Sequence, residues 1–380
     1  MTVSIHTHSI ESTGATEIYI SAAPSETAST AEHAEEIFSG ISDILKSKKA
    51  YIFQERVFAT QDAMEIICKA RSEAYGKLDD GVAPSLLVQQ EGLLGPIAGV
   101  QVHAIICGNK PEVVRLDEIE CGRILHMPGR AYLSLSSISG QQGKEITTHA
   151  QEMMEKAESA LIKYGADFLS VPRTWMWLKD ILSWYDEFNQ VRNEFFTKRG
   201  LIGAGTRQSM PASTGIGLGP ADGGDCAMDM IAVLGPTDCT KYLQAGGKQQ
   251  SALDYGSAFS RASKTDTPAG QTVYVSGTAS IDEDGATTNI DDAEGQIRDT
   301  IENVRAVLSD MHCIDEDVVQ VMAYCKTTEV ERTFNSSFRD TLPWPWITVI
   351  CDICRDDLLF EIEATATPKK SASEHKSVDT

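Results

Sequence analysis

The sequence predicts an α+β protein that consists of three tandem copies of one small unit. The same order of short strands and helices recurs at intervals of about 100 residues, a spacing typical of repeated structural units. The first helix of each copy carries apolar residues at three- and four-residue steps, as expected for a helix that packs on one face of a sheet. We therefore expect several small, similar units in place of one large domain.

The third copy, in the C-terminal part of the chain, has the clearest pattern. Its predicted strands and helices are, in order, strand 273–277, helix 291–311, strand 317–326, helix 329–338 and strands 347–351 and 358–366. The apolar stripe of the first helix consists of Ile297, Ile301, Val304, Leu308 and Met311. The closing strands are short and rich in apolar or β-branched residues, which suit sheet positions.

The other two copies follow the same order in weaker form. The first has predicted strands at 18–22, 50–58, 85–89 and 100–107 and helices at 31–46 and 61–75. The second has predicted strands at 131–135, 168–178, 212–218 and 227–234 and helices at 147–164 and 181–196. Each unit therefore reads βαβαββ, a sheet with two helices on one face.

The second face of each sheet must also be buried. Three copies in one chain can pack these faces together around a pseudo-threefold axis, so we expect a monomer that is an internal pseudotrimer. The predicted boundaries are a flexible N-terminus at 1–14, units at 15–110, 111–236 and 271–368, a linker at 237–270 and a disordered tail at 369–380.

Composition limits the classes of partner. The net charge of −22 argues against nucleic acid and anionic membranes, because the overall field repels both. No run approaches the roughly 20 apolar residues of a membrane span, and the polar N-terminus lacks the features of a secretory signal. Nine scattered cysteines, an odd number, favour a reducing cytoplasm over a disulfide framework. An anionic substrate would need a local cluster of arginines.

Three motifs of the third copy resemble the YjgF/Rid family. They are YVSGTASI at 274–281, the helix GQIRDTIENVRAVL at 295–308 and the closing strand FEIEATA at 360–366. Members of that family are small homotrimers of chorismate-mutase-like fold, with sites in the clefts between subunits. The resemblance implies that each copy is a Rid-like unit and that a functional site lies between units.

A second resemblance covers most of the chain. The segments RTWMWLKDILSWYDEFNQVRNEFF (173–196), PASTGIG (211–217), FSRAS (259–263), VSGTASI (275–281) and CRDDLLFEIEA (354–364) are similar to the chorismatase family. Those enzymes are built on Rid-like units and cleave chorismate, with release of pyruvate and without a metal or organic cofactor. One departure is that the family follows GTASI with a Gly-His pair, where this chain has the acidic stretch 282–286.

Glu361 and Glu363 alternate with apolar residues on the last strand, so both carboxylates point to one face of the sheet. The corresponding places hold 101–103 (Gln-Val-His) in the first copy and 228–230 (Met-Asp-Met) in the second, so only the third copy has a carboxylate pair. One interpretation is a pair of solvated strand residues. The resemblance instead implies that Glu361 lies in a cleft, where partial burial would keep it protonated as a general acid.

Chorismate is a dianion, so its recognition calls for two positive groups, preferably arginines. Arg173 and Arg261 are the chosen pair, and Arg207 and Arg192 are lesser candidates; for each, a solvated surface position is the alternative. The strand position at which Rid deaminases carry an arginine is Trp346 in this chain. The deaminase interpretation therefore lacks its main anchor.

Three further residues are candidates beside the substrate. Tyr185 follows a crowd of tryptophans that we assign to core packing, and it could lend its hydroxyl to the cleft. Ala262 and Cys354 are the candidates that decide the product by admitting or excluding water. Ala262 resembles the hydrolytic branch, which forms a dihydroxycyclohexadiene acid, whereas Cys354 resembles the 3-hydroxybenzoate branch, which we favour.

Two other functions remain open from the sequence. The first is a Rid-type enamine or imine deaminase that acts on a different small acid, since the acidic stretch 282–286 could mean an altered substrate. The second is a non-catalytic protein that uses the pseudotrimer only for binding. A chorismate assay that follows pyruvate would separate all three.

Overall fold

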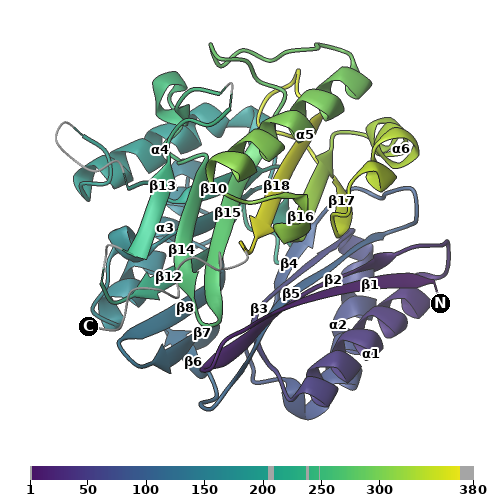
Figure 1. Cartoon of the computed structure of the whole chain (residues 1–380), viewed down its shortest axis with the longest axis vertical. Coiled ribbons are helices and arrows are strands. Elements are labelled where there is room, and N and C mark those ends of the chain that lie inside the picture. The colour runs from purple at the N-terminus through teal and green to yellow at the C-terminus, as the bar shows by residue number, and fades with distance from the viewer. Residues whose placement is uncertain (1, 204–208, 237–238, 248, 369–380) are drawn as a thin grey trace, which may run out of the picture.

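The computed structural model describes residues 2–203, 209–236, 239–247 and 249–368. These residues form three six-stranded sheets, each with a pair of helices on one face. Figure 1 shows α1 and α2 at the lower right, α3 and α4 at the left, and α5 and α6 at the upper right. The predicted α+β fold of three similar units is confirmed.

The first sheet has the strand order β1-β2-β5-β3-β4-β11. Its strands are β1 (Val3–Glu11), β2 (Ala15–Pro24), β3 (Tyr51–Ala59), β4 (Ser85–Val88), β5 (Ile97–Cys107) and the short β11 (Gly219–Pro220). Its helices are α1 (Thr30–Lys48) and α2 (Met64–Tyr75). Because β11 comes from the middle of the chain, the first two units are joined by strand pairing as well as by packing.

The second sheet has the order β10-β9-β12-β8-β7-β6. Its strands are β6 (Glu112–Leu116), β7 (Ile119–Met127), β8 (Arg130–Ile138), β9 (Arg173–Leu178), β10 (Ala212–Ile216) and β12 (Cys226–Leu234). Its helices are α3 (Ile146–Lys163) and α4 (Tyr185–Lys198). The inner strand β9 pairs in parallel with β10 and antiparallel with β12. The start of the RTWMWL segment at 173–178 therefore lies beside the PASTGIG segment at 211–217.

The third sheet has the order β13-β14-β15-β18-β16-β17. Its strands are β13 (Thr240–Leu243), β14 (Ala262–Thr267), β15 (Gly270–Ala279), β16 (Val318–Cys325), β17 (Trp346–Ile350) and β18 (Phe360–Ala366). Its helices are α5 (Ala293–Asp310) and α6 (Thr328–Ser337). The strand β18, which carries the two glutamates, lies in the interior of this sheet.

The predicted βαβαββ order is correct but incomplete, because each sheet has further strands at its N-terminal side. Residues 3–11 form β1, which pairs along β2, so the expectation of a flexible N-terminus was wrong. The expected linker at 237–270 contains β13 and β14, which continue the third sheet. The sequence pattern did not predict these strands, because they lie at or near sheet edges and are rich in polar residues. The predicted tail at 369–380 lies outside the described residues.

Side-chain caps mark where several helices begin. The hydroxyl of Ser29 accepts the Glu32 N–H at the start of α1, over 3.2 Å. The carboxylate of Asp292 accepts the Gly295 N–H at the start of α5, over 3.0 Å. Such caps satisfy backbone donors that have no partner within the helix. Of the helices in the described ranges, none is both long and apolar enough to cross a membrane.

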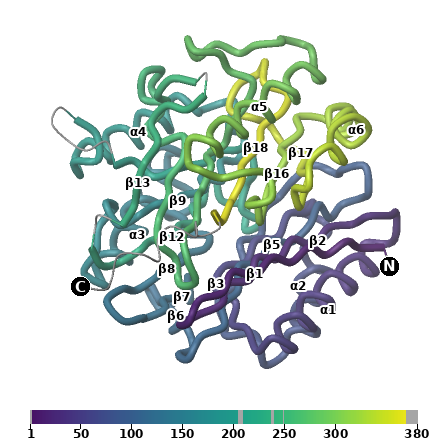
Figure 2. Tube along the Cα trace, in the orientation of Figure 1, coloured from purple at the N-terminus to yellow at the C-terminus, as the bar shows by residue number. Residues whose placement is uncertain are grey.

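Each sheet packs its helices over a hydrophobic core of its own, and the opposite faces of all three sheets meet in a fourth core. Phe58 of β3, Trp177 of β9 and Tyr324 of β16 all belong to this central core. The rings of Phe58 and Trp177 meet edge to face, with centres 6.1 Å apart. The trace in Figure 2 likewise shows strands inside and helix pairs outside. The three units thus form the predicted internal pseudotrimer.

Candidate active site

A pocket lies where the second unit meets the third. Its large polar side chains are Tyr185, Arg192, Tyr255, Arg261, Arg355 and Glu361, and Ser213 and Ser257 add two hydroxyls. Two hydrogen bonds between β10 and β15 hold the units together beside it: the Ser213 N–H donates to Ser276 Oγ over 2.8 Å, and the Gly277 N–H donates to Thr214 Oγ1 over 3.1 Å. We call this site the arginine pocket.

Glu361 enters the pocket from β18. Its apolar neighbours Phe360 and Ile362 belong to the core under α5, so the glutamate faces the other side of the sheet, as predicted. It is only 4% exposed, which rules out the solvated interpretation. The ladder of β15 is irregular between Val275 and Thr278, and a Cβ added to Gly277 there would lie 2.1 Å from Glu361 Oε1. Any side chain at position 277 would therefore displace this carboxyl.

Burial raises the pKa of Glu361 to about 8, and the negative charge of Glu363 adds to the shift, while Arg173 and Arg261 oppose it. The carboxyl is therefore mostly protonated at pH 7. Among the residues that the structure describes, none makes a hydrogen bond or an ion pair with it. A neutral acid whose proton is not committed to a protein acceptor can transfer that proton to a bound substrate.

Glu363, two residues along the strand, has a different environment. Its Oε2 accepts a hydrogen bond from Arg173 over 2.7 Å, its Oε1 accepts one from the Trp175 indole over 2.9 Å, and Arg56 lies 3.6 Å away. All four side chains are buried. Glu363 therefore belongs to a structural ion-pair network of the molecular centre.

This network engages Arg173, the first of the two predicted substrate clamps. The same Nη2 that binds Glu363 also lies 2.7 Å from Thr214 Oγ1, and the arginine does not line the pocket. The structure thus does not bring Arg173 together with the candidate ligand groups. The sequence placed it on the correct inner strand but could not show which buried carboxylate would meet its guanidinium.

Arg261, the second predicted clamp, does line the pocket. Its Nε and Nη2 donate to the Gln250 carbonyl over 3.1 and 3.0 Å, and its guanidinium lies 5.5 Å from the ring centres of Tyr255 and Phe259. The side chain is 1% exposed. This arginine is held rigidly by a backbone carbonyl and aromatic faces, with its charge beside the pocket.

Arg192, a lesser candidate from the sequence, also lines the pocket and is 1% exposed. Its Nη2 donates to Asn189 Oδ1 over 2.6 Å, but its Nε has no hydrogen-bond partner among the described residues. Burial lowers the pKa of this guanidinium. Because a buried donor without a partner is costly, the arrangement indicates a place for an anionic ligand group.

Arg355 is a pocket residue that the sequence reasoning missed. Its Nη1 donates to the Gly285 carbonyl over 2.7 Å. That carbonyl belongs to the acidic stretch 282–286, in which Asp282 Oδ1 accepts the N–H groups of Asp284 and Ala286 over 3.0 and 2.8 Å. The unusual acidic stretch therefore forms a turn that positions a pocket arginine. The available signal was the place of Arg355 directly after Cys354 in the CRDDLLFEIEA motif.

Tyr185 and Cys354, both predicted site residues, line the pocket. Burial raises the pKa of the Tyr185 hydroxyl, which is therefore a neutral donor. Burial, followed by the charge of Glu361, raises the pKa of the Cys354 thiol to about 12. The thiol is protonated at neutral pH and contributes a small, weakly polar wall and no nucleophile.

Two further residues that the sequence analysis singled out do not line the pocket. Ala262 is fully buried in the core under α5. Trp346 packs edge to face on Phe334, with ring centres 4.8 Å apart, so it lies on the helix side of its sheet. Arg207 lies outside the described residues. Tyr255, in the turn before β14, is a second pocket residue that sequence reasoning missed, since it belongs to no periodic element.

The second sheet also has a buried carboxyl on its central strand. Asp229 lies opposite Trp175, at the irregular step of the ladder between β12 and β8, and the same irregular step in the third sheet falls at Glu363. Its Oδ1 accepts the hydroxyl of Ser85 over 2.6 Å and the backbone N–H of Ser137 over 2.8 Å. Asp229 is fully buried, so it serves the contact between the first and second units. The third sheet differs in that a further carboxyl, that of Glu361, faces a pocket.

Comparisons with known proteins agree with this architecture. The family model described as endoribonuclease L-PSP matches residues 249–368. A crystal structure of chorismatase at 1.08 Å resolution aligns with a TM-score of 0.60 and 17% identity, over 97% of this chain and 100% of that one. No curated protein sequence gives a significant match.

Smaller solved proteins align with about one unit. A putative endoribonuclease from Thermotoga maritima is 24% identical over 34% of this chain and 98% of its own, with a TM-score of 0.28. Yeast Mmf1 is 18% identical over 34% and 99%, with a TM-score of 0.29. The alignment with the chorismatase structure, at a TM-score of 0.60 over 97% of the chain, shows that the whole chain has that fold, which confirms the predicted resemblance at the level of fold.

Proposed function

We propose that this protein is a chorismatase, an enzyme that cleaves the enolpyruvyl ether of chorismate and releases pyruvate. The observation that carries the proposal is Glu361, a buried carboxyl with a pKa of about 8 that faces a pocket with three arginines. This combination of a neutral acid and several fixed cations suits an acid-catalysed reaction of an organic anion. The whole-chain fold of a chorismatase agrees with it.

In the proposed reaction, Glu361 transfers its proton to the methylene carbon of the enol ether. The ether carbon becomes an oxocarbenium ion, water adds to it with loss of a proton, and the resulting hemiketal collapses to pyruvate and the ring alcohol. Glu361 returns to its neutral form by taking up a proton. A carboxyl of ordinary pKa would be ionised at pH 7 and could not start this sequence.

Arg261 keeps its predicted role as an anchor for the two carboxylates, and Arg192 and Arg355 take the place of Arg173. The three guanidinium groups come from different segments of the chain and surround the same pocket. The Nε of Arg192 has a vacant donor among the described residues, which a carboxylate oxygen would fill. Charge-assisted bonds from arginine are strong and directional, so they also orient the enol ether toward Glu361.

We favour 3-hydroxybenzoate as the ring product, which requires that the ring alcohol also lose its second hydroxyl group, together with a ring hydrogen, as water. Of the two residues on which the product choice rested, Cys354 lines the pocket and the Ala262 side chain does not. The preference for hydroxybenzoate therefore depends on the residue that can contact the ring. The dihydroxycyclohexadiene acid is the alternative product.

Incubation of the purified protein with chorismate tests the proposal. We expect release of pyruvate together with 3-hydroxybenzoate, both separated and quantified by chromatography. Dihydroxycyclohexadiene acid in place of hydroxybenzoate would correct the product and leave the enzyme class intact. Absence of pyruvate would reject the chorismatase proposal. Hydrolysis of a 2-aminoacrylate enamine would then favour the Rid-type deaminase, and inactivity in both assays would favour a binding protein.

A further inference from the structure

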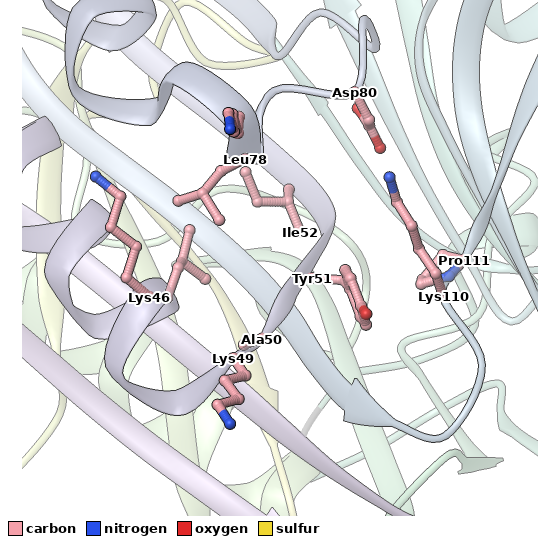
Figure 3. A pocket seen from close by; sticks show the side chains of 11 residues that line it. Lys46, Lys49, Ala50, Tyr51, Ile52, Leu78, Asp80, Lys110 and Pro111 are labelled. Atoms are coloured by element: carbon pink, nitrogen blue, oxygen red, sulfur yellow. The ribbon is translucent and has the colours of Figure 1, made fainter.

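A second cavity, of about 310 Å³, shares no lining residue with the arginine pocket. It lies between the end of α1, the start of β3, the turn after α2 and the connection from β5 to β6 (Figure 3). Its floor is apolar and consists of Leu45, Ile52, Leu78 and Pro111. The volume is within the range of about 300–1,000 Å³ typical of small-molecule sites, and the boundary between two units is a common place for them.

Lysines dominate the charge around this cavity. The four of them are Lys46, Lys49, Lys77 and Lys110. The only acidic lining residue is Asp80, whose carboxylate oxygens accept two hydrogen bonds of 2.7 Å from Arg123. That carboxylate also lies near the ammonium of Lys110 (Figure 3), so it offsets part of the lysine charge, but four lysines against one aspartate leave the lining positive. In a chain of net charge −22, this cavity reverses the sign of the general field.

One lysine has a clear structural role. Lys46 Nζ donates to the Ala74 carbonyl over 3.0 Å, at the end of α2. Lys49 ends α1 in the left-handed conformation, with φ of 55°. Lys77 and Lys110 are exposed and come from different segments, so helix capping does not explain their meeting at one cavity. Figure 3 shows Tyr51 between the α1 side of the cavity and Lys110.

We propose that this lysine cavity binds a small aromatic carboxylate. The apolar floor accepts the ring, and the ammonium groups of Lys77 and Lys110, with Lys49, bind the carboxylate. Tyr51 is 37% exposed and offers a ring face for stacking. An inorganic anion would pair with the lysines but leave the apolar floor exposed to water. A neutral aromatic molecule would cover the floor but leave the lysines unpaired. The inference does not depend on the function proposed for the arginine pocket.

Isothermal titration of the full chain with benzoate tests this site, with benzyl alcohol and inorganic phosphate as the uncharged and the non-aromatic probes. We expect the double variant Lys77→Ala/Lys110→Ala to raise the Kd for benzoate at least ~10-fold, because each lost charge-assisted hydrogen bond weakens the binding free energy. The matched control removes two exposed lysines elsewhere, as Lys69→Ala/Lys198→Ala, and should bind as the wild type does.

Because the arginine pocket could also take a carboxylate, the titration is repeated with Arg261→Ala, which should retain benzoate binding at the lysine cavity. The proposal would be overturned by wild-type affinity in the Lys77→Ala/Lys110→Ala protein, by loss of all binding in Arg261→Ala, or by no benzoate binding at all. Equal affinity for phosphate, or for benzyl alcohol, would likewise contradict an aromatic carboxylate as the ligand.

Discussion

Arg173 and Arg192 are both buried arginines on the second unit, but their partners assign them opposite roles. Arg173 neutralises Glu363 within the protein, over 2.7 Å. Arg192 has an Nε without a partner among the described residues and lines the arginine pocket. An arginine paired inside the protein stabilises the fold. A buried arginine that lines a pocket and has a donor without a partner can bind a ligand, although its burial lowers the stability of the free protein.

This difference predicts contrasting variants. Arg192→Met should lower kcat/KM on chorismate at least ~10-fold, because a charge-assisted bond to the substrate is worth roughly 1.5–3 kcal/mol. Its unfolding temperature should change little. Arg173→Met should instead lower the unfolding temperature strongly, since breaking a buried ion pair costs roughly 3–5 kcal/mol. Kinetics and thermal unfolding of both variants check this, and a fully active Arg192→Met would remove that arginine from substrate binding.

Gly277 tests the fit around the acid. In Gly277→Ala the new Cβ would lie 2.1 Å from Glu361 Oε1, so the carboxyl must move. A misplaced catalytic group loses rate steeply, and we expect kcat to fall at least ~10-fold while the protein still folds. The control is Gly108→Ala, where nothing lies within 4 Å of the added Cβ. Unchanged kcat in Gly277→Ala would show that the position of Glu361 is not critical.

At the scale of elements, the strands with apolar runs or regular alternation and the helices with an apolar stripe could be predicted from the sequence. The strand β18 is an example, because its alternation also placed Glu361 on the inner face. Strands such as β1 and β13 could not be predicted, since their side chains are largely polar or partly exposed. The pairing of Arg173 with Glu363 and the approach of Arg355 depend on contacts between distant segments, which periodicity does not encode.

The pairing of β1 with β2 leads to a test at this scale. Removal of residues 2–11 would expose the backbone edge of β2, which β1 covers from Thr16 to Pro24. We expect a lower unfolding temperature and more aggregation, as unpaired edge strands promote intermolecular pairing. Thermal unfolding and light scattering of the shortened chain measure both effects. Unchanged stability and solubility would show that the pairing of β1 contributes little to the stability of the sheet.

At the scale of the whole molecule, the central core uses the sheet faces that the helices leave bare. Phe58, Trp177 and Tyr324, one from each unit, are all buried there, so the chain supplies its own partners. We therefore expect a monomer of 41.3 kDa in solution. Multi-angle light scattering measures this mass directly. A mass near that of three chains would contradict the expectation that the internal pseudotrimer is a monomer.

Glu361 can act as the acid only while its carboxyl is protonated. Its pKa in the folded protein is about 8, above the ordinary value near 4.3, because burial disfavours the charged form. The Glu361 carboxyl is therefore protonated below about pH 8 and loses its proton as the pH rises through that value. Activity that needs the neutral carboxyl should be full at the lower pH and decline above it.

The most direct measurement is kcat/KM on chorismate between pH 6 and 9.5 for the wild type, Glu361→Gln and the control Asp229→Asn, which alters a buried carboxyl of the second sheet that does not line the arginine pocket. We expect the wild type and Asp229→Asn to lose activity above about pH 8, and Glu361→Gln to be at least ~100-fold slower at pH 7, since general acid catalysis contributes about 10²–10⁴-fold. A Glu361→Gln protein with wild-type activity and the same pH profile would contradict the assignment of Glu361 as the acid.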